Sequence, residues 1–244
     1  MTQCISKDGL IVGIAQLNDQ AISRGIRFSH TASAPGFYAR RGKRMFDAFT
    51  SAIALLLLSP LFIVVSLLIK LTSSGPIFFS QQRVGREGRL FRIAKFRSMR
   101  DGAKKQLAIT AHGDPRITAL GRVLRFLKVD ELPQLWNVLK GEMSLVGPRP
   151  ELPRYVAHYT DRQRRVLAFR PGMTDSASIK YAREEYALGQ QADPERFYAN
   201  VILPDKLDLN LQYLERITLF RDLSLLSKTV IAICFSLSDS VTTT

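Results

Sequence analysis

The residues AFTSAIALLLLSPLFIVVSLLI, positions 48–69, are the longest stretch of this 244-residue chain without a charged side chain. An α-helix rises about 1.5 Å per residue, so a run of this length could cross a hydrocarbon core of about 30 Å. On hydropathy alone, a single transmembrane helix is the simplest interpretation. The run starts well inside the chain and no small-residue cleavage pattern follows it, so it is not a signal peptide.

Two features favour a different path through the membrane. Ser59 and Pro60 lie near the middle of the run, and a proline inside a helix removes a donor and costs about 3 kcal/mol. The Ser59 hydroxyl can replace one lost hydrogen bond. Basic residues lie on both flanks, and by the positive-inside rule they place both ends on the cytoplasmic side; they are Arg40, Arg41, Lys43 and Arg44 before the run and Lys70, Arg83, Arg86, Arg89 and Arg92 after it. We therefore predict a re-entrant helix–break–helix hairpin rather than a span.

Around this hairpin the sequence indicates an α+β, mostly helical protein. We predict three parts: a variable N-terminal extension at 1–39, the hairpin at 40–72 and a larger domain at 73–244, which holds the residues discussed below as candidates for catalysis. The third part shows short β-like pieces near 77–79 and 90–93, with turn glycines around them. Helical periodicity is visible at 116–128, 132–140, 151–170 and 204–236, the last of which is amphipathic.

Composition narrows the class of partner. The chain has 35 Lys and Arg against 21 Asp and Glu, a net charge of +14, which indicates an anionic partner: nucleic acid, an anionic membrane or a phosphorylated substrate. Only Cys4 and Cys234 are present, so neither a disulfide framework nor a cysteine zinc site is indicated. There is no P-loop, no dinucleotide-binding glycine motif, no Asp-x-Asp pair and no module typical of nucleic-acid binding around the basic residues.

The residues that could carry chemistry are an acidic pair and several cations. Asp130 and Glu131 precede a predicted short helix with Pro133 in its first turn, where free N–H groups and the helix dipole favour carboxylates and phosphates. Taken alone, such a pair is more often a solvated cap. Lys95, Arg97 and Arg149 add cations elsewhere, Arg149 between two prolines. Together they supply a nucleophile, a ligand for Mg²⁺ and phosphate-binding groups.

In this order the motifs resemble those of the small monotopic phosphoglycosyl transferases of the bacterial sugar transferase family, over residues from about 40 to about 230. The motifs are RMFD (44–47), SP (59–60), GPIFF (75–79), QRVG (82–85), KFRSM (95–99), DPRIT (114–118), DELPQLWN (130–137) and GPRPE (147–151).

The resemblance implies a membrane-bound enzyme that transfers a sugar 1-phosphate from a UDP-sugar to undecaprenyl phosphate. Asp130 would be the nucleophile and form a covalent aspartyl-phosphosugar, with release of UMP, and Glu131 would hold Mg²⁺. Arg149, Lys95, Arg97 and, more weakly, Arg125 would bind phosphate oxygens. It also implies the bacterial inner membrane, with the catalytic domain on the cytoplasmic face, lipid contacts and no nucleic-acid partner. The sequence leaves a homodimer open, and does not name the sugar.

One region departs from the family pattern. Many members carry Pro-Gly-Ile-Thr-Gly-Trp, whereas this chain has Pro171-Gly172-Met173-Thr174-Asp175-Ser176, with Glu184 and Glu185 nearby. A second function class also stays open: a membrane-tethered basic protein that binds anionic lipid or nucleic acid without catalysis. Acidic residues beside an anion site would weaken such a binder. A conventional glycosyltransferase would release UDP instead of UMP.

Overall fold

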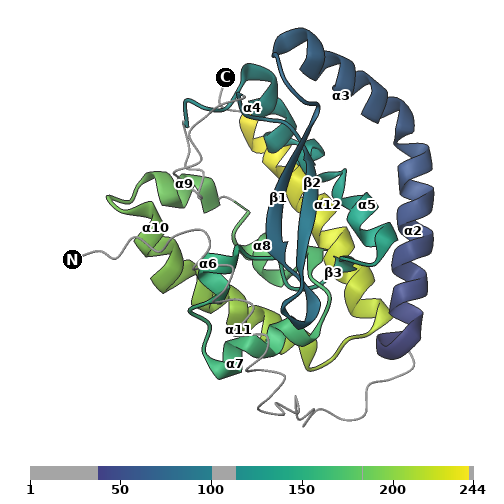
Figure 1. Ribbon diagram of the computed structural model, residues 1–244, viewed down its shortest axis with the longest axis vertical. Coiled ribbons are helices and arrows are strands. Elements are labelled where there is room, and N and C mark those ends of the chain that lie inside the picture. Colours follow the sequence, from purple (N-terminus) through teal and green to yellow (C-terminus); the bar gives the residue numbers. More distant parts are fainter. Residues whose placement is uncertain (1–37, 101–113, 183, 242–244) are drawn as a thin grey trace.

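The computed structural model describes residues 38–100, 114–182 and 184–241 (Figure 1). Helices dominate these ranges, and the strands form two small sheets. The α+β, mostly helical class predicted from the sequence is confirmed. The predicted extension at 1–39 lies almost wholly outside the described residues.

The uncharged run forms two helices, α2 (Lys43–Leu57) and α3 (Ser59–Thr72), which follow a π-helical turn at Tyr38–Gly42. Pro60 leaves the carbonyl of Leu56 without its usual helical donor. The Ser59 hydroxyl donates to that carbonyl at 2.8 Å, as the sequence predicted. In the described ranges, no helix by itself has the length and apolar character of a membrane span, but α2 and α3 together do, and they bend by 60° at the break.

Polar contacts fasten α2 to the rest of the protein, along one edge of the molecule (Figure 1). Arg44 donates to the carbonyls of Val138 and Leu139, at 2.6 and 2.7 Å. Asp47 is buried and accepts hydrogen bonds from the Ser144 hydroxyl and the Leu145 amide. Because these are charged or buried groups, their loss would leave unsatisfied partners. Helix α2 is therefore held in one position against α5 (Gln134–Lys140) and β3 (Ser144–Val146).

The chain leaves α3 into an antiparallel pair, β1 (Phe78–Val84) and β2 (Leu90–Phe96), joined by a 3₁₀ turn at Arg86–Gly88. These strands are the two β-like pieces expected from the sequence, each extended by several residues. Phe96 at the end of β2 is buried in a cluster with Val65 and Ile69 of α3. The ladder therefore connects α3 to the part of the chain that follows it.

The second sheet was not expected from the sequence. It pairs β3 (Ser144–Val146) with β4 (Gly172–Thr174) in parallel. Each strand has only three residues, too few to show an alternating pattern. A Cβ on Gly172 would lie 2.1 Å from the amide nitrogen of Gly147, so the two backbones approach as closely as only glycine permits.

The helical stretches differ from the sequence expectation mainly in being shorter and more broken. The stretch 151–170 holds three short helical pieces. The predicted helix over 204–236 is two helices, because Thr218 accepts from the Arg221 amide and starts the second one. The helices are α4 (Ala119–Phe126), α5 (Gln134–Lys140), α6 (Pro153–Val156), α7 (Asp161–Arg164), α8 (Ser176–Lys180), α9 (Glu184–Gly189), α10 (Pro194–Phe197), α11 (Leu203–Leu214) and α12 (Leu219–Val241), with 3₁₀ turns at Val129–Glu131 and Arg165–Ala168 and a π turn at Tyr198–Ile202.

Candidate active site

Asp130 and Glu131 lie in a 3₁₀ turn between α4 and α5. Lys128, just before the turn, has the left-handed backbone angle φ 55°, which is uncommon for a residue with a side chain and often marks a functional site. Asp130 is only 5% exposed. The predicted helix over 132–140 starts two residues later than expected, with Pro133 as its N-cap, so the acidic pair precedes the helix by one turn.

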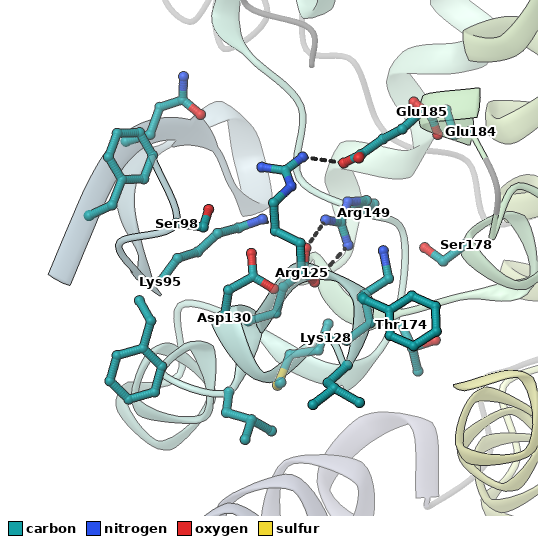
Figure 2. A pocket seen from close by; sticks show the side chains of 18 of the residues that line it. Lys95, Ser98, Arg125, Lys128, Asp130, Arg149, Thr174, Ser178, Glu184 and Glu185 are labelled. Atoms are coloured by element: carbon teal, nitrogen blue, oxygen red, sulfur yellow. Dashed lines mark hydrogen bonds and ion pairs between the residues drawn. The ribbon is translucent and has the colours of Figure 1, made fainter. Parts of the chain in front are cut away.

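Glu131 is the centre of a charge cluster. Its carboxylate accepts from the Lys95 ammonium at 2.7 Å and from both terminal nitrogens of Arg149, as Figure 2 shows for the Arg149 pair. Burial alone would raise the pKa of Glu131, but Arg149 and Lys95 outweigh burial and hold that pKa well below its ordinary value. Three residues that the sequence marked separately therefore form one site.

Asp130 lies in a different environment from its neighbour. Burial raises its pKa above the ordinary value, the Lys95 charge opposes this in part, and the negative charge on Glu131 adds to it. Its Oδ1 atom is buried and has no hydrogen-bond partner among the described residues. A carboxylate with a raised pKa and a free oxygen is a stronger base, and a better nucleophile when ionised, than its salt-bridged neighbour.

The cations of the cluster are positioned by residues outside it. The Asn137 side chain accepts from the Ala94 amide at 3.0 Å and donates to the Arg92 carbonyl at 2.8 Å, which fixes β2, and with it Lys95, against α5. Asn137 belongs to the motif over 130–137, but its bridging role could not be predicted from that motif.

Arg149 is positioned by a residue that the sequence analysis marked only as a departure. Asp175 is buried, accepts from the Ser178 amide as the cap of α8, and accepts from the Arg149 amide at 3.2 Å. Because Gly147 packs against Gly172, the segment that carries Arg149 is held along β4. The Asp-x-x-Ser spacing of 175–178 was a signal for the cap, though not for its contact with Arg149.

Arg125 reaches the site from α4. It forms an ion pair with Glu185 of α9, and Figure 2 shows this pair above Asp130, close to Arg149. The Arg125 charge lowers the pKa of Asp130 against the effect of burial. Arg125, the weaker candidate from the sequence, therefore lies at the site. It is held there by Glu185, which belongs to the region that departs from the family pattern.

Arg97 does not join the ion pairs around Glu131. Its Nη2 donates to the carbonyl and the hydroxyl of Ser73, at 2.8 and 2.7 Å, where α3 ends. Arg97 is 7% exposed, and its Nε and Nη1 are buried without a partner in the described part of the chain. Of the predicted phosphate-binding residues, it is the one that contacts the hairpin.

The acidic pair, the four cations and Glu185 line one open cleft of about 2550 Å³, whereas Asn137 and Asp175 lie behind them and do not line it; the lining residues include Lys95, Arg97, Arg125, Asp130, Glu131, Arg149 and Glu185. Ligand pockets for small molecules measure about 300–1,000 Å³, so the cleft has room for a nucleotide sugar together with the head of a second substrate. In the ranges that the structure describes, no three His, Cys, Asp or Glu side chains are grouped closely enough to hold a metal by themselves. Mg²⁺ is commonly bound by one or two carboxylates, with water and substrate phosphates as its other ligands.

Comparisons with known proteins give the family of the chain. The family described as bacterial sugar transferase matches residues 38–236. A UDP-N-acetylgalactosamine-undecaprenyl-phosphate N-acetylgalactosaminephosphotransferase of Aeromonas hydrophila is 39% identical over 77% of this chain and 42% of its own length. The exopolysaccharide production protein ExoY of Rhizobium meliloti is 33% identical over 80% of this chain and 86% of its own.

A third relative, an undecaprenyl-phosphate glucose phosphotransferase of Komagataeibacter xylinus, is 45% identical over 59% of this chain and 28% of its own length. The chain thus spans less than half of two of these three relatives. Their names give different sugars, so similarity does not determine the sugar here. The first and third of these relatives are named as sugar phosphotransferases. The chain belongs to the bacterial sugar transferase family.

Proposed function

We propose that this protein transfers a sugar 1-phosphate from a UDP-sugar to undecaprenyl phosphate, releases UMP, and thereby starts the synthesis of exopolysaccharide or another surface glycoconjugate. The observation that carries the proposal is the environment of Asp130. Its carboxylate is buried and has an unsatisfied oxygen among the described residues, and the neighbouring Glu131 forms ion pairs with Lys95 and Arg149. The similarity to relatives named for this transfer supports it.

The reaction proceeds in two displacements at one phosphorus atom. A carboxylate oxygen of Asp130 attacks the sugar-proximal phosphate of the donor, the bond to the bridging oxygen breaks, and UMP leaves with that oxygen. The phosphosugar is then held as an acyl phosphate on Asp130. An oxygen of undecaprenyl phosphate attacks the same phosphorus, the bond to Asp130 breaks, and the product is a polyprenyl diphosphosugar. The raised pKa of Asp130 favours the first attack once the carboxylate is ionised.

Charge on the phosphates is absorbed by the cations of the cleft. Lys95 and Arg149 are paired with Glu131, and Arg125 with Glu185. These carboxylates hold the cations in place before substrate arrives, so little reorganisation is needed when phosphate oxygens replace or share the contacts. The guanidinium of Arg149, fixed at its backbone by Asp175, suits the charge spread over phosphate oxygens.

Glu131 is also the residue proposed to hold Mg²⁺, together with oxygens of the donor diphosphate. The fit rests on the donor set: two adjacent carboxylates, of which Asp130 keeps an unsatisfied oxygen, while Glu131 already accepts from Lys95 and Arg149. When bound, the ion would neutralise charge on the diphosphate. Titration of activity with Mg²⁺ tests this assignment: Glu131→Gln should need more Mg²⁺ for half-maximal activity, and an unchanged requirement would assign the ion to other groups.

The bent pair α2 and α3 is proposed to enter and leave the membrane from the cytoplasmic face of the inner membrane. Both flanks are basic, and the first helix is fastened to the catalytic domain by Arg44 and Asp47. Such an arrangement sets the cleft at the lipid surface, where a polyprenyl phosphate and a soluble nucleotide sugar can meet.

The test is an assay with a panel of UDP-sugars, polyprenyl phosphate and Mg²⁺. Release of UMP together with a lipid diphosphosugar is the expected result, and the panel identifies the sugar. Release of UDP would indicate a conventional glycosyltransferase. Binding of anionic vesicles without nucleotide release from any donor would favour the non-catalytic membrane-tethered protein instead.

A further inference from the structure

Arg97 has more hydrogen-bonding capacity than its surroundings use. Among the described residues, Nη2 alone has partners, both on Ser73, while Nε and Nη1 are buried and have none there. A buried donor without a partner is costly, and more so when it carries charge. A guanidinium in this state indicates a place where an anion completes the hydrogen bonds.

The place is the junction between the membrane hairpin and the cleft. Ser73 is the residue at which α3 ends, and Arg97 follows β2 and lines the cleft. Figure 2 shows Lys95 and Ser98, the near neighbours of Arg97 in the chain, on one side of Asp130, and Arg149 and Ser178 on the other. Arg97 therefore lines the same cleft as Asp130 and Arg149, and it is attached at the residue where α3 ends.

The surroundings of Arg97 are aromatic and partly exposed. Phe96 is buried and packs against Phe62 of α3 and Phe78 of β1, with ring centroids 5.1 and 5.4 Å apart. Phe78 and Phe79 line the cleft and are 49% and 45% exposed. An exposed apolar surface that continues from the hairpin toward a buried guanidinium suits an amphiphile with an anionic head.

We propose that Arg97 binds the phosphate head of the lipid acceptor, with Phe78 and Phe79 beside the first part of its hydrocarbon chain, while Arg149 and Arg125 serve the donor diphosphate. The inference rests on the proposed function and adds to it a division of the cleft: a donor side and a lipid side, with Asp130 between them. The bonds to Ser73 hold the guanidinium at the end of α3, so the lipid head is recognised where the hairpin meets the catalytic domain. Nε and Nη1 lie beneath the surface, and binding requires a local shift of the covering atoms.

The two half-reactions allow the roles to be separated. The purified full chain is first mixed with donor and Mg²⁺ alone and the released UMP is measured. Polyprenyl phosphate is then added at increasing concentration and formation of lipid diphosphosugar is followed. For Arg97→Ala we expect UMP release within about twofold of the wild type and a half-saturating acceptor concentration raised by about tenfold or more, as for loss of one charged hydrogen-bond pair. Arg92→Ala is the matched control, because Arg92 lies on β2, the strand that Arg97 follows, and is exposed; both measurements should stay at wild-type values.

Competition by inorganic phosphate and a second variant, Arg97→Lys, decide between the other possible results. Inorganic phosphate is added as a competitor, and an effect of Arg97→Ala on phosphate inhibition without any change in acceptor saturation would overturn the proposal, because the site would then take free phosphate. An unchanged response to both would overturn it too. If Arg97→Ala loses UMP release as well, Arg97→Lys decides: restored UMP release with weak acceptor saturation supports the lipid role, and any other result contradicts it. A wild type that releases no UMP from any donor would refute the proposed function itself, and the inference with it.

Discussion

Asp130 and Glu131 are neighbours in the chain, yet their surroundings move their pKa values in opposite directions. Burial raises the pKa of Asp130, while Arg149 and Lys95 lower that of Glu131 against burial. Such a division between two adjacent carboxylates is how one site supplies both a nucleophile and a fixed anionic anchor. Loss of the charge on Asp130 should therefore stabilise the folded protein, whereas loss of the charge on Glu131 should destabilise it.

Asp130→Asn is expected to stabilise the protein at neutral pH by a few degrees in Tm, since functional sites commonly reduce stability. The pKa of Asp130 is higher in the folded state than in the unfolded chain, so ionisation penalises folding at pH values above the folded-state pKa. This penalty disappears as the pH falls below both values. Thermal unfolding in detergent at several pH values should show a gain in Tm for Asp130→Asn that becomes smaller as the pH is lowered.

Glu131→Gln is the matched comparison, and we expect its change in Tm to have the opposite sign. The folded pKa of Glu131 is lowered, so its charge contributes stability above the unfolded pKa, which is lost as the pH falls through the folded value. This variant should unfold at a lower Tm at neutral pH, because Arg149 and Lys95 lose their partner. Equal shifts of the same sign in the two variants would contradict the assigned environments.

If Arg125 binds the donor diphosphate as proposed, the phosphate oxygens must take the place of Glu185, which forms an ion pair with Arg125. The pair is partly exposed, and such pairs contribute about 0–1 kcal/mol. Glu185→Gln should therefore lower the KM for the UDP-sugar by up to about fivefold, with kcat little changed. Glu195→Gln is the control, because Glu195 forms a comparable ion pair with Arg154 outside the residues that line the cleft. A KM that rises in Glu185→Gln would show that Glu185 binds the donor directly.

At the scale of the element, α5 connects the catalytic pair to the hairpin. The acidic pair precedes its first turn, and the carbonyls of its last turn accept from Arg44 of α2. A cation at the C-terminal end of a helix satisfies free carbonyls and complements the dipole. Any shift of the hairpin therefore acts on the helix next to the nucleophile.

Arg44→Ala should destabilise the protein by about 1–3 kcal/mol, the range for hydrogen bonds that involve a charged group. Denaturant unfolding measures this loss, and kcat should fall with it because α5 is less well positioned. Arg41→Ala is the control, since Arg41 is exposed near the same end of α2. Equal stability of the two variants would remove the proposed link between hairpin and site.

Element boundaries also show where sequence reasoning worked. The break at Ser59 and Pro60 was predictable, since proline acts on its own helix and the serine hydroxyl bonds within one turn. The small parallel sheet was not, because its strands are three residues long and are held by the packing of Gly147 on Gly172, distant in sequence. Helix lengths failed for a different reason: a local cap such as Thr218 divides a stretch whose apolar periodicity continues across it.

In the site too, some features could be predicted from the sequence, whereas others depend on contacts between residues distant in the chain. Asp130, Glu131, Lys95, Arg125 and Arg149 come together as the motifs suggested. The partners that position them, Asn137, Asp175 and Glu185, are joined by contacts across the fold. No spacing within one motif reveals these contacts. Arg97 was predicted to bind phosphate, but its contact with the end of α3 depends on the hairpin's position.

For the whole molecule, the net charge of +14 and the basic flanks of the hairpin favour a protein that stays on one side of the membrane. In a chain with Cys4 and Cys234 replaced, single cysteines at Arg41 and Ser74 should both react with an impermeant label in inverted vesicles and both be protected in intact cells. Pro60→Leu, which removes the break, should shift the two sites toward opposite sides. Labelling of the two ends from opposite sides in the parent chain would refute the re-entrant path.

The central claim is that Asp130 carries the phosphosugar between two substrates. Intact-protein mass spectrometry after incubation with donor and Mg²⁺, without acceptor, tests it most directly. We predict a mass increase of one sugar phosphate located at Asp130, released UMP in equal amount, and loss of the adduct on addition of polyprenyl phosphate, with no adduct in Asp130→Asn. Turnover by Asp130→Asn at a near-normal rate, or product formation by the wild type without any adduct on Asp130, would contradict the account.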